Sequence, residues 1–328
     1  MKQGLIKITR SREFGLAALL VVMIVAVTLR APHFFTFRNM VGILNDTSVL
    51  TIVALAQLLV ILTGGIDLSL GSTMALTGMS IGLVNQNFPE LNSLSLILIA
   101  LAFGLALGAF NGVLVAYGRI PAIITTLGTM SIYRGFTFLV SGGQWVSAHE
   151  MNANLTEIPG STVLGVQQLL WFAVIVVLVA WVFLGRSRTG REIYAVGGDR
   201  NATAFVGIRV PRIDALVFTL SGMLAGLGGM LYVARYASAQ TDTANGFELQ
   251  AVAACVIGGV SIAGGSGSVI GVVLGAVFLG VLYNALTMIN LSPFFQMGIQ
   301  GIVILSAIVA NTVVDRANQQ KLARRRLV

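Results

Sequence analysis

Long apolar runs alternate with short polar stretches along the whole chain, and this pattern predicts an all-α polytopic membrane protein. Most runs approach the ~20 residues that a helix needs to cross a bilayer. They lie at 14–30, 47–63, 68–84, 94–117, 120–140, 167–184, 213–233, 249–263, 268–289 and 296–313. The pattern therefore predicts a single transmembrane domain, residues 1–328, with about ten helices.

Three runs, 47–63, 68–84 and 249–263, hold only about 15–17 residues, which is short for a full crossing. Half-helices are tolerated where they line a cavity or are buried in protein, so we expect eight to ten spans, some short or broken. Two passages with paired glycines, 63–72 and 257–266, resemble one another. Paired interruptions mark the pathway in transporters with duplicated halves. Chance similarity is an equal alternative in a chain with 38 glycines.

The composition excludes a soluble globular protein, because only 10% of the residues are charged and 56% are apolar. A soluble domain averages about a quarter charged residues. The first run follows four basic residues, as in a signal peptide, but Leu29–Pro32 offers no small-residue cleavage site. We therefore expect an uncleaved first span.

The basic residues predict the orientation, because 16 of the 20 fall on one side of a ten-span arrangement. These are Lys2, Lys7, Arg10, Arg12, Arg119, Arg186, Arg188, Arg191, Arg200, Arg209, Arg212, Arg316, Lys321, Arg324, Arg325 and Arg326. We expect a cytoplasmic N-terminus (1–13), inner loop (185–212) and basic tail (314–328), and a periplasmic loop (141–166). The net charge of +8 then reflects topology, and no nucleic-acid partner is expected.

No catalytic residue, cofactor site or metal site is predicted in this chain. The string nearest to a phosphate-binding loop, 185–192, has Arg191 in place of the lysine and Glu192 in place of the hydroxyl residue. His33 and His149 lie apart near the outer surface, and Cys255 is expected to be a small buried residue.

Five polar residues within or directly beside apolar runs are candidates for the transport pathway, because such residues are costly in a membrane. Asp67 could cap a helix or contact the pathway, and Arg134 could pair with a carboxylate or reach outward. Asn111, Asn284 and Gln296 could bond between helices or face a hydrophilic solute.

The inner segment 190–214 contains Asp199 and, after a short run, Gly207, which predicts a short capped helix that ends in glycine. A helix ringed with arginines at the bilayer surface could anchor to lipid headgroups. It also has the shape needed to insert into a soluble partner.

Four strings in order, GGIDLSLGS, NGVLVAYGRIPAIITTLGTMSIYRG, TGREIYAVGGDRNATAFVGIRV and FELQAVAACVIGGVSIAGGSGS, are similar to the permease subunits of bacterial ABC importers for ribose, xylose, rhamnose and autoinducer 2. The similarity runs over about residues 14–313. SGGQWVSAHEM and VAACVIGGVSIAGG resemble the rhamnose-type and autoinducer 2-type branches, and rhamnose is favoured, with autoinducer 2, ribose or xylose as alternatives.

The resemblance implies the ABC importer permease fold in the bacterial inner membrane. Two permeases, copies or paralogues, would form the pore above two ATPase subunits that carry ATP and magnesium. A periplasmic binding protein would deliver the sugar, and transport would proceed by alternating access.

The resemblance also implies an ATPase-coupling helix, carried by Gly198, Asp199, Asn201, Ala202, Ala204 and Gly207. Asn201 departs from the acidic residue of the looser importer signature, which leaves the details of the ATPase contacts open.

Three rival functions remain at this point. An ion-coupled secondary transporter would need buried acidic residues along its spans, and by sequence only Asp67 qualifies. A membrane-embedded enzyme would need paired catalytic residues, which the spans lack. ATP-dependent accumulation against a gradient would exclude a passive channel.

Overall fold

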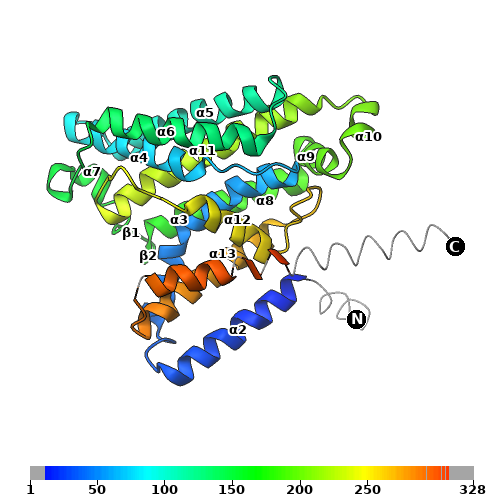
Figure 1. The fold of residues 1–328 in the computed structure, drawn as a ribbon. Coiled ribbons are helices and arrows are strands. Elements are labelled where there is room, and N and C mark those ends of the chain that lie inside the picture. Colours follow the sequence, from blue (N-terminus) through cyan, green and yellow to red (C-terminus); the bar gives the residue numbers. More distant parts are fainter. Residues whose placement is uncertain (1–11, 293, 304, 307, 310–328) are drawn as a thin grey trace.

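The computed structural model describes residues 12–292, 294–303, 305–306 and 308–309, and over these residues the fold is a bundle of helices (Figure 1). Residues 1–11 of the predicted N-terminal segment and the whole predicted basic tail, 314–328, lie outside the described residues.

Within the described residues, seven helices are long and apolar enough to cross a bilayer. These are α2 (Arg12–Arg30), α3 (Phe37–Leu62), α5 (Ser93–Ala116), α6 (Ala122–Ser141), α8 (Gln168–Arg186), α11 (Val210–Tyr236) and α13 (Val269–Met288). The remaining three predicted runs correspond to α4 (Leu70–Asn87), the short α12 (Phe247–Ile257) and a helix over Phe294–Val303. The predicted all-α polytopic fold with some short helices is confirmed.

The second span, α3, is longer than the sequence predicted, with 26 residues. Polar residues near its start lower the local hydropathy but find partners inside the protein. Asn39 and Asn284 exchange two side-chain hydrogen bonds of 3.0 and 3.1 Å. Asp46 forms an ion pair with Arg235. Because these partners come from distant helices, a local hydropathy pattern cannot reveal them, and the prediction of a short segment here is wrong.

The polar loops lie at the two ends of the bundle. The start of α2 lies at the same end as α9 (Arg188–Gly198) and α10 (Arg200–Phe205), which we call the inner end after the predicted orientation (Figure 1). The opposite, outer end carries η1 (Ala148–Glu150), α7 (Ala153–Thr156) and the antiparallel pair β1 (Thr162–Val163) and β2 (Val166–Gln167).

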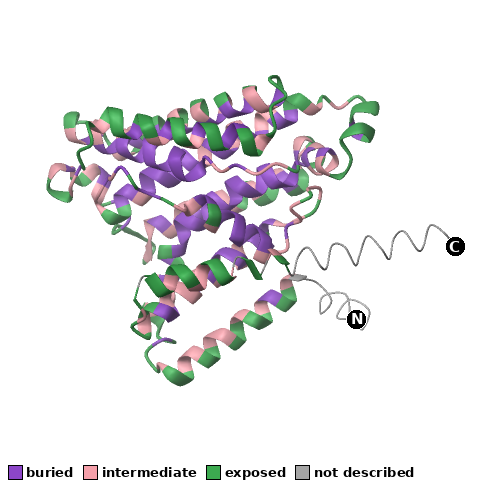
Figure 2. Cartoon of the chain, in the orientation of Figure 1, coloured by how far each residue is buried: buried purple, intermediate pink, exposed green. Residues whose placement is uncertain are grey.

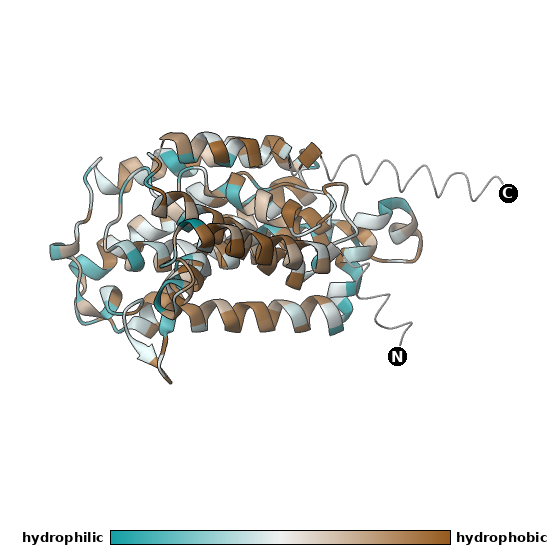
Figure 3. Cartoon of the chain, turned by 90° about the horizontal axis from the view of Figure 1, so that it is seen from below, coloured by the Kyte–Doolittle hydropathy of each residue, from teal (hydrophilic) through white to brown (hydrophobic). Residues whose placement is uncertain are grey.

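Burial is concentrated around α3, in the middle of the bundle (Figure 2). Of the most apolar stretch of α3, 89% is buried, against 6% in α2. Apolar side chains cover much of the length of the helices, whereas hydrophilic residues gather toward the two ends (Figure 3). An exposed apolar band between polar ends is the surface that a bilayer covers.

Helices α5 and α11 cross in very close contact, through glycines spaced four residues apart on each. Gly104 and Gly108 on α5 face Gly222 and Gly226 on α11. A Cβ atom added to Gly108 would lie 2.8 Å from the Cα of Gly222, which no real Cβ atom tolerates. Small residues at this spacing let helix backbones approach closely in membranes, and here they fix the position of the central helix α11.

We expect Gly108→Val to lower the stability of the fold by about 1–3 kcal/mol or more, because the neighbouring atoms are backbone and cannot yield. Thermal unfolding of the purified protein in detergent measures this loss. Gly15→Val makes the same change in α2, where an added Cβ meets nothing within 4 Å, and should leave the unfolding temperature nearly unchanged. Equal effects of both substitutions would contradict the close crossing.

Two elements are interrupted, and their helices begin side by side inside the protein. Residues 63–69 precede α4, and residues 237–246 lead into α12 after Ala239 has paired with Val146 of the outer loop. A Cβ atom on Gly71, at the start of α4, would lie 2.6 Å from the carbonyl oxygen of Ala244, just before α12. The broken helices expected at 68–84 and 249–263 therefore place their N-terminal ends together.

Candidate functional site

At the inner end, glycines from three distant segments meet in what we call the glycine junction: Gly64, Gly197, Gly198, Gly264 and Gly265. Gly265 donates its backbone N–H to the carbonyl oxygen of Leu62 at 2.9 Å. A Cβ atom on Gly197 would overlap both of these groups, and one on Gly264 would lie 2.9 Å from the backbone nitrogen of Gly64. The two similar glycine passages found in the sequence thus touch each other here, with the end of α9 packed against both.

Helix α9 is fixed to the junction by a further hydrogen bond. The Tyr194 hydroxyl donates to the carbonyl oxygen of Gly267 at 2.9 Å. Burial raises the pKa of Tyr194, which keeps this hydroxyl protonated as a donor. Ser187 caps the start of the helix by accepting the backbone N–H of Gly190 at 2.8 Å. The segment after α8 is therefore held rigidly against the spans.

The short capped helix predicted from the sequence is present as α10. Asp199 accepts the backbone N–H groups of Asn201 and Ala202 at 2.9 and 3.0 Å. Gly207 ends the segment with φ of 84°, a left-handed conformation that favours glycine. Both ends of the helix thus have the local chemistry that the sequence indicated.

The six predicted coupling residues lie together on and beside this segment, and all six are exposed. Sequence reasoning missed two neighbours that the structure singles out. Phe205 and Val206 are 91% and 75% exposed, although both are large and apolar. The sequence did contain a signal for them, since they form an apolar pair within an arginine-rich loop.

Arg200 ties α10 to the body of the protein. Its guanidinium donates to both carboxylate oxygens of Asp214 on α11, at 3.0 and 2.7 Å, and to the carbonyl oxygen of Thr63 at 3.3 Å. Asp214 is almost completely buried, whereas the Arg200 side chain is half exposed. Arg200 therefore links α10 directly to α11 and to the end of α3.

Asp67 and Asn111 belong to one buried network rather than to an open pathway in this conformation. Asp67 accepts the backbone N–H and the hydroxyl of Ser69, at 2.9 and 2.6 Å. It does not accept an N–H from the first turn of α4, so its predicted role as a helix cap is wrong in this detail. Asn111 donates to the Ser69 hydroxyl at 2.8 Å and accepts from Tyr133 at 3.4 Å.

The other polar candidates have separate partners. Asn284 on α13 pairs with Asn39 on α3. Of the two alternatives given by the sequence, this is the hydrogen bond between helices. Gln296 donates to the carbonyl oxygen of Leu291 and closes the turn before the last described helix. Arg134 donates to the carbonyl oxygens of residues 241 and 243 at 3.1 and 2.8 Å, so it neither reaches outward nor bonds directly to a carboxylate.

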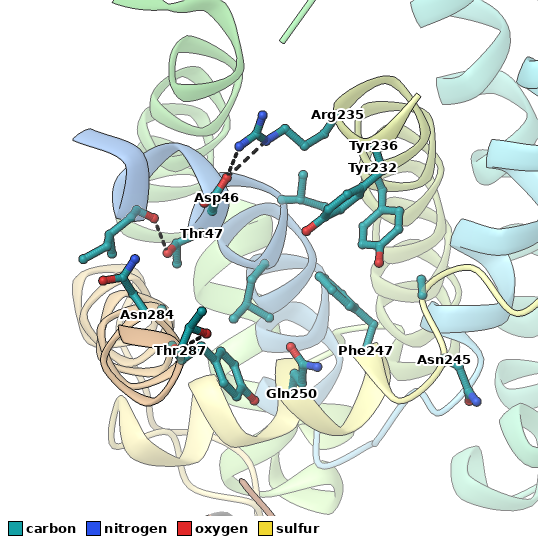
Figure 4. Close-up of a pocket in the computed structure, with 16 residues that line it drawn as sticks. Asp46, Thr47, Tyr232, Arg235, Tyr236, Asn245, Phe247, Gln250, Asn284 and Thr287 are labelled. Carbon is teal, nitrogen blue, oxygen red and sulfur yellow. Dashed lines mark hydrogen bonds and ion pairs between the residues drawn. The ribbon is translucent and has the colours of Figure 1, made fainter. Parts of the chain in front are cut away.

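A cavity of about 530 Å³, the outer pocket, lies among α3, α11, α12 and α13. Its wall combines aromatic rings, amides, hydroxyls and an ion pair (Figure 4). The labelled lining residues are Asp46, Thr47, Tyr232, Arg235, Tyr236, Asn245, Phe247, Gln250, Asn284 and Thr287. A concave site with rings and a few converging polar groups suits a small polar molecule.

Two acidic residues besides Asp67 are buried in the bundle, which corrects the expectation that it stands alone. Asp214 is 5% exposed and Glu248 is 8% exposed. The burial of these two residues could not be predicted from the sequence, because each lies at the edge of an apolar run. Cys255 is buried as expected, and its thiol donates to the carbonyl oxygen of Ala54 at 3.2 Å.

Residues 39–308 match the protein family described as branched-chain amino acid transport system / permease component. The chain is similar to the ribose import permease protein RbsC of Escherichia coli K12, at 44% identity over 90% of this chain and 92% of that protein. RbsC of Haemophilus influenzae is 40% identical over 89% of this chain and 90% of its own length. The autoinducer 2 import system permease protein LsrC of Klebsiella pneumoniae is 35% identical over 96% of this chain and 89% of its own length. No solved structure matches the chain.

Proposed function

The chain belongs to this family of transport-system permease components, and from that premise we propose that it forms the membrane path of an ABC importer for a monosaccharide. It is a multi-pass protein of the bacterial inner membrane. The proposed partners are two ATPase subunits that carry ATP and magnesium, a periplasmic sugar-binding protein and a second permease, either a copy or a paralogue.

The observation that carries this proposal is the apolar pair Phe205–Val206, exposed on a rigidly held helix at the inner end. Exposed apolar side chains on a polar loop mark a docking surface. Because α10 is bonded to Asp214 and Thr63 through Arg200, a partner that moves α10 also moves two central helices. Docking of the ATPase can shift the permease between its inward-open and outward-open states only if the two states bind the ATPase with different affinity.

The sugar is proposed to be of the ribose or autoinducer 2 type, after the relatives named above. The aromatic rings and amides of the outer pocket support a neutral, hydroxyl-rich solute. Rhamnose, which the sequence favoured, stays a prediction without support from these relatives.

We expect Phe205→Glu to lower ATP-driven sugar uptake about tenfold, because it places a charge where an apolar anchor would enter the ATPase. Uptake of labelled D-ribose into proteoliposomes that contain permease, ATPase and binding protein measures this effect, together with ATP hydrolysis. Leu164→Glu makes the same kind of change at an 88% exposed leucine of the outer end and should leave ATPase binding intact. Unchanged uptake by the Phe205 variant would refute α10 as the docking element.

A further inference from the structure

A second cavity, distinct from the outer pocket, lies between α6 on one side and, on the other, residues 237–246 (the interrupted segment) and the start of α12. This cleft has a volume of about 600 Å³. Its lining includes Ser131, Arg134 and Phe138 from α6, Asp242 and Asn245 from the interrupted segment, and Glu248 from the first turn of α12. In Figure 4 the side chain of Asn245 points away from the other labelled residues of the outer pocket. The interrupted segment therefore forms a wall with a cavity on each side.

Glu248 is the unusual residue of this cleft. It is 8% exposed, and its Oε2 atom has no hydrogen-bond partner within the described part of the chain. A buried polar atom without a partner is costly and calls for an explanation. Oε2 lies against Gly71, at the start of α4, where the free N–H groups give the helix end a partial positive charge. That charge helps to hold the carboxylate in place at the wall of the cleft, with Oε2 turned toward the helix end.

Arg134 supplies donors beside this acceptor. The Nη1 atom of its guanidinium donates to the carbonyl oxygens of both Thr241 and Thr243. These contacts fix the side chain and leave the Nε and Nη2 donors for a ligand. Arg134 is close enough to Glu248 and Asp242 for direct electrostatic attraction.

The position of the cleft fits a transport path rather than a lipid-facing groove. Arg134 lies seven residues before the end of α6, about 10 Å inside its outer end. Ionisable groups at such depth face a water-filled cavity or the interior of an assembly, because exposure to lipid is costly. The cleft also adjoins the place where both interrupted helices begin, which is where discontinuous helices bind solutes in transporters.

We propose that this cleft holds a neutral monosaccharide during passage, with a sugar hydroxyl donating to the carboxylate of Glu248 and Arg134 donating to sugar oxygens. Phe138 offers an apolar surface for the C–H face of the sugar. Two carboxylates against one guanidinium disfavour an anionic sugar phosphate. The inference rests on the proposed importer function and adds to it the site and the chemical class of the solute.

The test uses the complete importer in proteoliposomes, with saturating binding protein loaded with D-ribose or with single-deoxy ribose analogues. We expect Glu248→Gln to lower the maximal uptake rate of ribose about tenfold, since a charged hydrogen bond is lost. At least one deoxy analogue, slower than ribose in the native protein, should become as fast as ribose in this variant. A purely structural role would slow all the sugars equally and keep their ranking. Glu157→Gln removes an exposed carboxylate of the outer loop and serves as the matched control.

Ser131→Leu keeps the proposal testable if the Glu248 variant fails to fold. Ser131 is exposed on the cleft wall, so a larger side chain should fill the cleft and lower uptake while ATP hydrolysis continues. If both variants keep the native uptake rates and the native ranking of ribose and its analogues, the proposal is overturned. It is also overturned if, at constant ATP, uptake follows an ion gradient set across the vesicle membrane. If the native protein shows no ATP-driven uptake of ribose at all, the importer function for this sugar fails before the cleft is tested.

Discussion

Gly197→Val is expected to lower ATP-driven uptake about a hundredfold, the largest effect of any single substitution considered, equivalent to about 3 kcal/mol. An added Cβ atom would overlap the carbonyl oxygen of Leu62 and the backbone nitrogen of Gly265. Both neighbours are backbone, and they hydrogen-bond to each other at 2.9 Å. The valine must therefore separate α9 from the end of α3, from the 258–268 loop, or from both.

The measurement is ribose uptake by the complete importer in proteoliposomes, with ATP hydrolysis recorded in parallel. Gly185→Val, near the inner end of α8, is the matched control, because a Cβ atom there meets nothing within 4 Å. We expect it to keep most of the activity. If the two variants behave alike, contact at the glycine junction does not carry the coupling.

Arg200→Ala should be more damaging than Asp214→Ala, although the two substitutions break the same ion pair. The Asp214 side chain is 7% exposed and would be left as a buried, unpaired charge, whereas Arg200 is 50% exposed and can turn into water. Breaking a buried pair costs about 3–5 kcal/mol. The half-exposed arginine reduces this to about 2–3 kcal/mol for Arg200→Ala, with a smaller loss for Asp214→Ala.

Thermal unfolding of the single and double variants in detergent gives the coupling energy between the two residues. Arg188→Ala serves as the comparison, because the Arg188–Glu192 pair joins neighbouring turns of α9 and Arg188 is 86% exposed. Its loss should cost no more than about 0.5 kcal/mol. A larger effect from Asp214→Ala than from Arg200→Ala would contradict this argument. It would mean that an unpaired Arg200 costs more stability than an unpaired Asp214.

The sequence predicted the features of this protein that depend on local chemistry. Each of the ten apolar runs contains a helix in the described part of the chain, because a bilayer requires each segment to satisfy its own backbone groups. The capped helix at Asp199 and its glycine end followed from residue types a few positions apart. The segment that carries the predicted coupling residues was located for the same reason.

What the sequence could not predict depends on contacts between distant segments. The start of α3 looked too polar to span, because Asn284 and Arg235, which pair with its side chains, lie some two hundred residues away in the chain. Glu248 looked like a residue at the border of a helix, since only the fold brings Gly71 and Arg134 beside it. The glycine pairs were noticed as a repeat, whereas their close contact could be seen only in three dimensions.

The weak hydropathy of α4 has a consequence for how the protein is made. This helix of 18 residues is rich in glycine, serine and threonine, and it does not qualify by itself as a spanning segment. It is buried among α5, α6 and α11, and α11 lies so close that a Cβ atom on Gly78 would lie 2.9 Å from the carbonyl oxygen of Gly229. Since α11 begins 140 residues after α4, ribosome and translocon must deliver over a hundred further residues before α4 gains this neighbour. The packing around α4 is therefore complete only once α11, synthesised after it, has joined the bundle.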